Sequence, residues 1–138
     1  MTFSGINYIA VIIATLAGFG LGAVWYMVLG GLWLHAIGKT REELSKNEGA
    51  AKALPFIIAL VALFVMAWML AGLMGHLGDV TVRGGVISGL FVWVGFVITT
   101  MGVNHAFGGA KPMLTLIDGG HWLAVLLVMG AVIGAFGA

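Results

Sequence analysis

The sequence predicts an all-α membrane protein, a bundle of four transmembrane helices with a short cytoplasmic amphipathic helix between the first two spans. Composition is the first observation, since apolar residues make up 62% of the 138 residues and charged residues only 8%. Soluble domains carry about 25% charged residues, so this chain has too few to cover a water-exposed surface. The second observation is four long apolar segments, because an apolar helix needs roughly 20 residues to cross a bilayer.

The spans are predicted at about residues 7–33, 55–75, 84–103 and 117–136 of one membrane domain covering residues 1–138. These segments lack acidic and basic residues except for Asp118, at the start of the fourth, which we interpret as an N-cap. In the first loop, Thr40 and Glu43 form a capping-box pattern, which predicts a helix over about residues 41–46. The other links are short, so we expect consecutive spans to be antiparallel neighbours.

The distribution of basic residues predicts the orientation of the chain. Cytoplasmic loops of membrane proteins are enriched in Lys and Arg. Here the first and third loops carry all but one of these residues, and Arg83 alone lies on the opposite side. We therefore expect the first and third loops in the cytoplasm and both termini outside. The basic residues of the two loops are Lys39, Arg41, Lys46, Lys52 and Lys111.

Small residues recur at intervals of four along every span. Lipid provides little hydrophobic drive between helices, so spans associate by close packing, for which small residues are favoured. Such a row of small residues on every span favours a homo-oligomer or a larger membrane complex, although glycine is also simply frequent in membrane helices. The predicted helix-packing positions are Gly18, Gly22, Gly85, Gly89, Gly130 and Gly134.

A cluster of polar and aromatic side chains is expected inside the bundle, nearer the cytoplasmic leaflet. Thr100 and Asn104 are four residues apart and Trp93 lies seven before Thr100, so an uninterrupted helix would place them on one face. A buried tyrosine hydroxyl needs a partner, which this face offers to the first span. The expected cluster serves either helix–helix hydrogen bonding or a site, and it consists of Trp25, Tyr26, Trp93, Thr100 and Asn104.

Histidines make a weak case for a metal site. His35, His105 and His121 all map to the cytoplasmic side, and Asp118 and His121 are three residues apart on one helical face. Neutral imidazole and carboxylate groups do ligate zinc or iron. However, these residues form no compact ligand motif, and the chain has no cysteine. We therefore predict no metal site and no cofactor.

Motifs along the chain carry a family resemblance. They are G-x-x-W-Y at residues 22–26, TREEL at 40–44, G-F-x-x-T-T-x-x-x-N at 95–104 and I-D-G-G-H-W-L from residue 117. In these motifs the chain resembles small bacterial four-span membrane proteins catalogued as a domain of unknown function. The resemblance covers nearly the whole chain. It implies a four-span fold in the bacterial cytoplasmic (inner) membrane and no established activity.

The sequence favours a protein without catalytic activity. It contains no nucleophile elbow, phosphate-binding loop or pair of intramembrane carboxylates, so we do not expect an enzyme. A net charge of +1 provides no basic field for nucleic acid, which leaves the lipid bilayer and other membrane proteins as partners. The favoured function is a non-catalytic packing or oligomerising module, or an accessory subunit of a membrane complex. The alternative is transport of a small solute or proton through an interior lined by Tyr26, Thr100 and Asn104.

Overall fold

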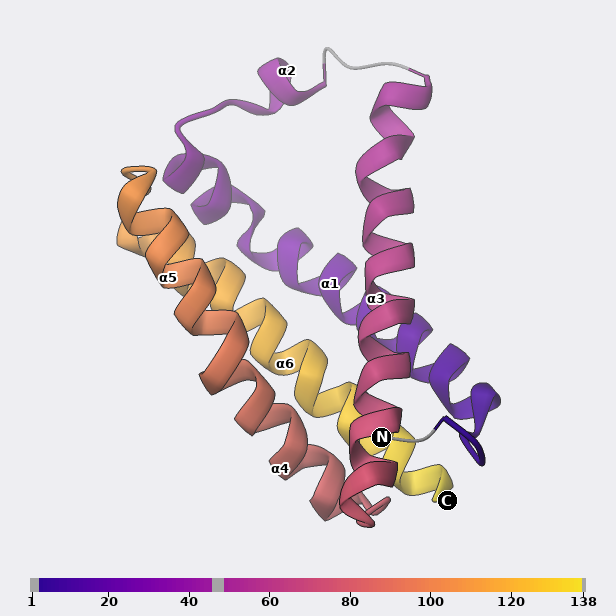
Figure 1. Cartoon of the computed structure of the whole chain (residues 1–138). Helices are drawn as coiled ribbons and strands as arrows, with labels where there is room; N and C mark the ends of the chain where they lie inside the picture. The colour runs from indigo at the N-terminus through magenta and orange to yellow at the C-terminus, as the bar shows by residue number, and fades with distance from the viewer. Residues whose placement is uncertain (1–2, 46–48, 138) are drawn as a thin grey trace.

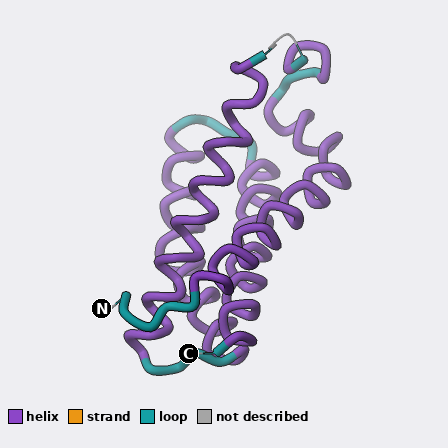
Figure 2. Tube along the Cα trace, turned by 90° about the vertical axis from the view of Figure 1, so that its right-hand side faces the viewer, coloured by secondary structure: helices purple, strands orange, loops and turns teal. Residues whose placement is uncertain are grey.

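Four long helices form a bundle in the computed structural model, which describes residues 3–45 and 49–137 (Figures 1 and 2). Every regular element in these ranges is helical, and α2 (Arg41–Leu44) is the short helix of the first loop. The third long helix is continuous but contains a π-helical turn, η1 (Trp93–Val97). The long helices are α1 (Tyr8–Ile37), α3 (Ala50–Leu77), α4 (Val82–Val92) continued through η1 into α5 (Ile98–Phe107), and α6 (Pro112–Phe136).

All four long helices are long and apolar enough to cross a membrane. The chain is therefore an integral membrane protein with four spans, and the predicted fold class is confirmed. Most helix ends extend beyond the predicted spans, because helical structure continues into the polar flanking residues. The first-loop helix ends at Leu44, and its predicted end at Lys46 lies outside the described residues.

Local sequence signals set several of the helix ends. The side chain of Asn7 accepts a hydrogen bond from the backbone N–H of Ala10 at 3.2 Å, which caps the start of α1. Thr40 caps α2 and Thr81 caps α4 in the same way. Gly38 ends α1 with a left-handed backbone at φ 71°, a conformation that glycine adopts without steric cost.

Helix α6 lies at the centre of the packing, against α1 on one side and α4 on the other (Figure 1). Both termini and the link between α3 and α4 lie at one end of the bundle, which we call the terminal end. The opposite end, which we call the α2 end, holds α2 and the link between α5 and α6. Towards the α2 end, the axes of α1 and α3 diverge, and residues 51–58 of α3 are exposed. The buried core lies away from this end, with Val11, Ala67, Met74 and Met129 among its residues.

The predicted packing glycines make close contacts within this one chain. A Cβ atom added to Gly85 would overlap the backbone of Gly130, and one added to Gly134 would overlap the carbonyl of Thr81. A Cβ on Gly89 would lie 2.7 Å from the carbonyl oxygen of Leu126. On α1, Gly18 faces side chains of α3 and α6. The homo-oligomer stays a prediction, and these glycines have packing partners without it.

Candidate functional site

A cavity of about 900 Å³ lies between α1, α3 and α6, with α2 at its rim. It occupies the α2 half of the bundle, where α1 and α3 diverge (Figure 1). Aromatic side chains form much of its wall, including those of Trp33 and Trp122, and Asp118 and His121 also line it. The cavity therefore combines an apolar wall with ionisable groups inside the membrane-spanning part of the chain.

Asp118 lies well inside α6 and is not its N-cap. The helix begins at Pro112, with Lys111 in the N-cap position, and proline is favoured in the first helical turn because its missing N–H is not needed there. Our interpretation of Asp118 as a cap is therefore wrong, since the fourth helix starts before the apolar run does. The carboxyl group lies on the cavity wall.

Tyr26 holds this carboxyl group from α1. Its hydroxyl donates a hydrogen bond to Oδ1 of Asp118 at 2.6 Å. The tyrosine ring also packs edge-on against Trp33, with ring centroids 5.9 Å apart. Among the described residues, Oδ1 is the one oxygen of Asp118 that has a hydrogen-bond partner, so Oδ2 remains available to a molecule in the cavity.

His121 lies one helical turn from Asp118 and is 7% exposed. Its ring lies 5.0 Å from that of Tyr26 and 4.6 Å from that of Trp122. Gly22 leaves the space for it, because a Cβ there would lie 2.9 Å from Nε2. Nδ1 is buried and has no hydrogen-bond partner in the described part of the chain. An unpaired buried polar atom costs about 1–3 kcal/mol, so this nitrogen requires an explanation.

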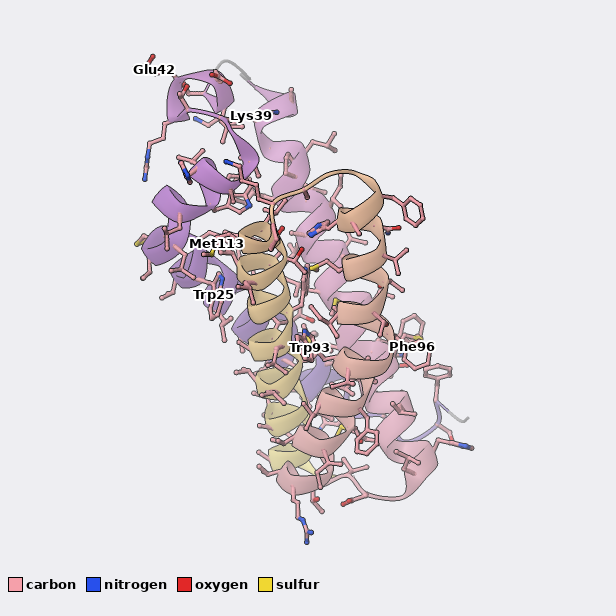
Figure 3. All side chains as sticks on the ribbon, turned by 90° about the vertical axis from the view of Figure 1, so that its left-hand side faces the viewer. Trp25, Lys39, Glu42, Trp93, Phe96 and Met113 are labelled. Carbon is pink, nitrogen blue, oxygen red and sulfur yellow. The ribbon has the colours of Figure 1, made fainter. Side chains whose placement is uncertain are left out.

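Two indole groups brace α6 from opposite sides of the site. Trp25 on α1 donates its Nε1–H to the carbonyl of Ile117 at 3.0 Å. Trp93, the first residue of the π-helical turn, donates to the carbonyl of Gly119 at 2.8 Å. Figure 3 shows the two labelled side chains approaching α6 from different neighbouring helices. Since the two carbonyls flank Asp118 in sequence, these bonds fix the α6 segment that carries the carboxyl group.

The glycines after Asp118 make room for large side chains of the neighbouring helices. A Cβ on Gly120 would lie 3.0 Å from Cζ2 of Trp25. A Cβ on Gly119 would lie 2.7 Å from Cδ1 of Ile98 and 3.9 Å from Cζ2 of Trp93. The run Asp-Gly-Gly-His thus places two polar side chains on α6 and lets two large side chains pack closely beside them.

The expected interior cluster divides in the structure. Trp25, Tyr26 and Trp93 all contact α6, but Thr100 and Asn104 are exposed. The hydroxyl of Thr100 donates to the carbonyl of Phe96 in its own helix at 2.6 Å. The π-helical turn supplies the physical reason. It holds one residue more than an α-helical turn, which rotates the later positions by about 100° relative to an uninterrupted helix.

The weak metal candidates do not converge. His105 Nδ1 is 2.8 Å from the hydroxyl of Thr115, and His35 is exposed near the end of α1. Within residues 3–45 and 49–137, no three His, Cys, Asp or Glu side chains gather in a way that could hold a metal ion. Of the four candidates, Asp118 and His121 share the cavity wall.

Sequence reasoning missed Arg41 and Lys52 as site residues. Both line the cavity, Arg41 from α2 and Lys52 from the exposed start of α3. In the sequence, these two residues indicate only the orientation of the chain. Trp33 and Trp122 also line the cavity. The available signal was Asp118, the single acidic residue of the four long helices, because an ionisable residue inside a span marks a functional site by default.

The cavity can hold a molecule that is apolar along most of its length and polar at defined positions. Hydrogen bonds are available at Oδ2 of Asp118, and the aromatic wall favours apolar contact.

Comparisons with known proteins identify the family to which the chain belongs. No curated protein and no solved structure matches the chain significantly. Residues 9–134 match one family model, so the chain belongs to the family described as protein of unknown function (DUF1761).

Proposed function

We propose that the protein is a non-catalytic membrane protein that binds a small amphiphilic molecule in the cavity between α1, α3 and α6. One observation carries this proposal: the cavity of about 900 Å³ has Asp118 and His121 in its wall. Cavities of roughly 300–1,000 Å³ with apolar walls and a few well-placed polar groups are typical of small-molecule sites.

The placement of these polar groups favours binding over packing. Intramembrane ionisable residues are costly, and they are found where a substrate or ion contacts the protein. If Asp118 served only to join helices, both of its carboxyl oxygens would be paired with neighbouring helices. Instead, Asp118 lines the cavity and uses one of its two carboxyl oxygens in the bond from Tyr26.

This proposal replaces the packing module as the favoured function. The prediction of a packing module rested on the rows of small residues, which a single bundle was not expected to need. The structure gives four of these glycines packing partners within the chain, namely Gly85, Gly89, Gly130 and Gly134. Transport through an interior that includes Thr100 and Asn104 loses support, because both are exposed. We retain a homo-oligomer or a larger membrane complex as a prediction about partners besides the surrounding lipid.

We further propose that the α2 end faces the cytoplasm of a bacterial cell, with both termini outside the inner membrane. Lys39, Arg41, Lys52 and Lys111 support this orientation, because they lie at the α2 end. Arg83 lies in the first turn of α4, at the terminal end. The remaining basic residue, Lys46, lies outside the described residues.

Filling the cavity tests the proposed function. Ala59 on α3 lines the cavity, so Ala59→Phe should occupy it. Ala53, on the same helix, is exposed and does not line it, which makes Ala53→Phe a matched control. Each protein is purified in mild detergent, and the bound small molecules are extracted and identified by mass spectrometry.

We expect an amphiphile enriched over bulk lipid in the wild type and the Ala53→Phe variant and depleted in the Ala59→Phe variant. Equal content in all three proteins, or no enrichment in the wild type, would overturn the proposal. Thermal unfolding of each variant checks that Ala59→Phe is folded. If it is not, Ala59→Leu, with a smaller added volume, takes its place in the comparison.

A further inference from the structure

We infer that the bound molecule is an anionic single-chain amphiphile with a free hydroxyl close to its charged head, the chemistry of an anionic lysophospholipid. This inference rests on the proposed function and names the class of ligand for the same cavity. It comes from the order of side chains along the cavity, which has a basic rim, a polar middle and an apolar floor.

The rim favours an anionic head. Arg41 and Lys52 line the cavity at the α2 end, and a guanidinium nitrogen of Arg41 lies 3.8 Å from the position of a Cβ on Gly30. Within the described part of the chain, neither cation is engaged in an ion pair. The neighbouring Glu42 and Glu43 do not line the cavity. Arg and Lys side chains both recognise phosphate well, because they offer several charged donors.

The middle of the cavity favours a hydrogen-bond donor. Tyr26 lies four residues before Gly30 on α1, which places it about 6 Å deeper along the helix, roughly the reach of a three-carbon linker. At this depth Asp118 offers Oδ2 as an acceptor, while Oδ1 is occupied by Tyr26. His121 lies one α6 turn further on and lines the cavity with its ring, while its Nδ1 is covered by protein atoms, so Oδ2 of Asp118 is the acceptor at this depth. A glycerol hydroxyl meets this requirement, and in a glycerolipid a free hydroxyl means that one acyl chain is missing.

The floor favours one hydrocarbon chain. One turn of α1 deeper than Gly22, which faces His121, the cavity is lined by Gly18, Phe19 and Leu63, none of which carries a polar side chain. The cavity therefore changes from charged to apolar lining in the direction from the α2 end towards the middle of the membrane, and a bound amphiphile would lie with its head at the α2 end. A lipid in the adjacent leaflet has the same order, so a lipid-derived ligand would enter between α1 and α3 without turning over.

The test measures binding of defined single-chain lipids to the purified protein through its tryptophan fluorescence, since Trp33 and Trp122 line the cavity. The probes are lysophosphatidate, its analogue without the glycerol hydroxyl, neutral monoacylglycerol, a single-chain alkylammonium, and inorganic phosphate as competitor. We expect lysophosphatidate to bind at least tenfold more tightly than the deoxy analogue or monoacylglycerol. Inorganic phosphate at millimolar concentration should not displace it.

Variants assign each preference to its residue. Lys52→Gln should weaken lysophosphatidate binding severalfold and leave monoacylglycerol binding unchanged, whereas Lys39→Gln, which alters a cation outside the cavity lining, should change neither. Asp118→Asn should reduce the advantage of lysophosphatidate over its deoxy analogue. Equal binding of charged and neutral lipids, or tighter binding of alkylammonium, would overturn this inference and leave the proposed function standing. If no amphiphile binds, or Ala59→Phe affects none, the proposed function itself fails.

Discussion

The hydroxyl of Tyr26 on α1 lies 2.6 Å from Oδ1 of Asp118 on α6, and this bond joins residues 92 positions apart. It holds the two helices together at the level of the cavity, where α1 and α3 have already diverged. It also pairs one oxygen of the lone carboxyl group within the spans. The same contact thus stabilises the bundle and orients a side chain towards the cavity.

We predict a favourable coupling between Tyr26 and Asp118. In a double-mutant cycle of Tyr26→Phe and Asp118→Ala, the free energies of unfolding should be non-additive by about 1 kcal/mol. Interhelical hydrogen bonds in membranes average about 0.6 kcal/mol and reach about 1.7, and an acidic acceptor favours the upper half of this range. Unfolding in mixed detergent measures the coupling. A cycle of Tyr26→Phe with Asn104→Leu is the control and should be additive, because Asn104 is exposed; coupling found there instead would contradict the structure.

We predict that Gly85→Ala destabilises the bundle by roughly 1–3 kcal/mol, as overpacking does. The added methyl group would overlap the backbone of Gly130, which cannot move aside as a flexible side chain can. Gly102, in the same long helix, has no heavy atom within 4 Å of an added Cβ, so Gly102→Ala should leave the melting temperature unchanged or raise it. Equal melting temperatures for the two variants would show that α4 and α6 do not approach this closely.

We predict that the indole N–H groups beside Asp118 contribute to stability. Trp25→Phe and Trp93→Phe each remove one donor to an α6 carbonyl, and each should cost about 0.5–1.5 kcal/mol beyond the lost ring volume. Trp68→Phe is the control, because Nε1 of Trp68 is buried without a partner among the described residues. The Trp68→Phe substitution should therefore remove no hydrogen bond. A larger loss for Trp68→Phe than for the other two would contradict the bracing of α6.

We predict that thiol labelling of single cysteines in intact cells will show the α2 end inside the cell. The chain has no native cysteine, so single cysteines report their own position. Glu42→Cys on α2 should be shielded from an impermeant thiol reagent, and Leu77→Cys at the exposed end of α3 should react. Both should react once the membrane is permeabilised. The opposite labelling pattern would place the α2 end outside the cell.

The sequence alone determined the number of spans, the first-loop helix and several helix ends. These features follow from local physics. A bilayer requires about 20 apolar residues per span, and Thr40 or Gly38 ends a helix through the backbone groups beside it. The glycine positions were also evident from spacing, although which helix each one would meet was not.

The tertiary structure alone decided the site. Which side chain meets Tyr26 depends on the rotation of α6 about its axis and on where α6 begins, and Pro112 starts that helix before the apolar run. Asp118 therefore lies on the cavity wall and Asn104 does not. The π-helical turn at Trp93–Val97 rotates Thr100 and Asn104 away from the face predicted for an unbroken helix. Trp93, the first residue of this turn, bonds to Gly119 on another helix, and residues 93–97 contain no local pattern from which the turn could be predicted.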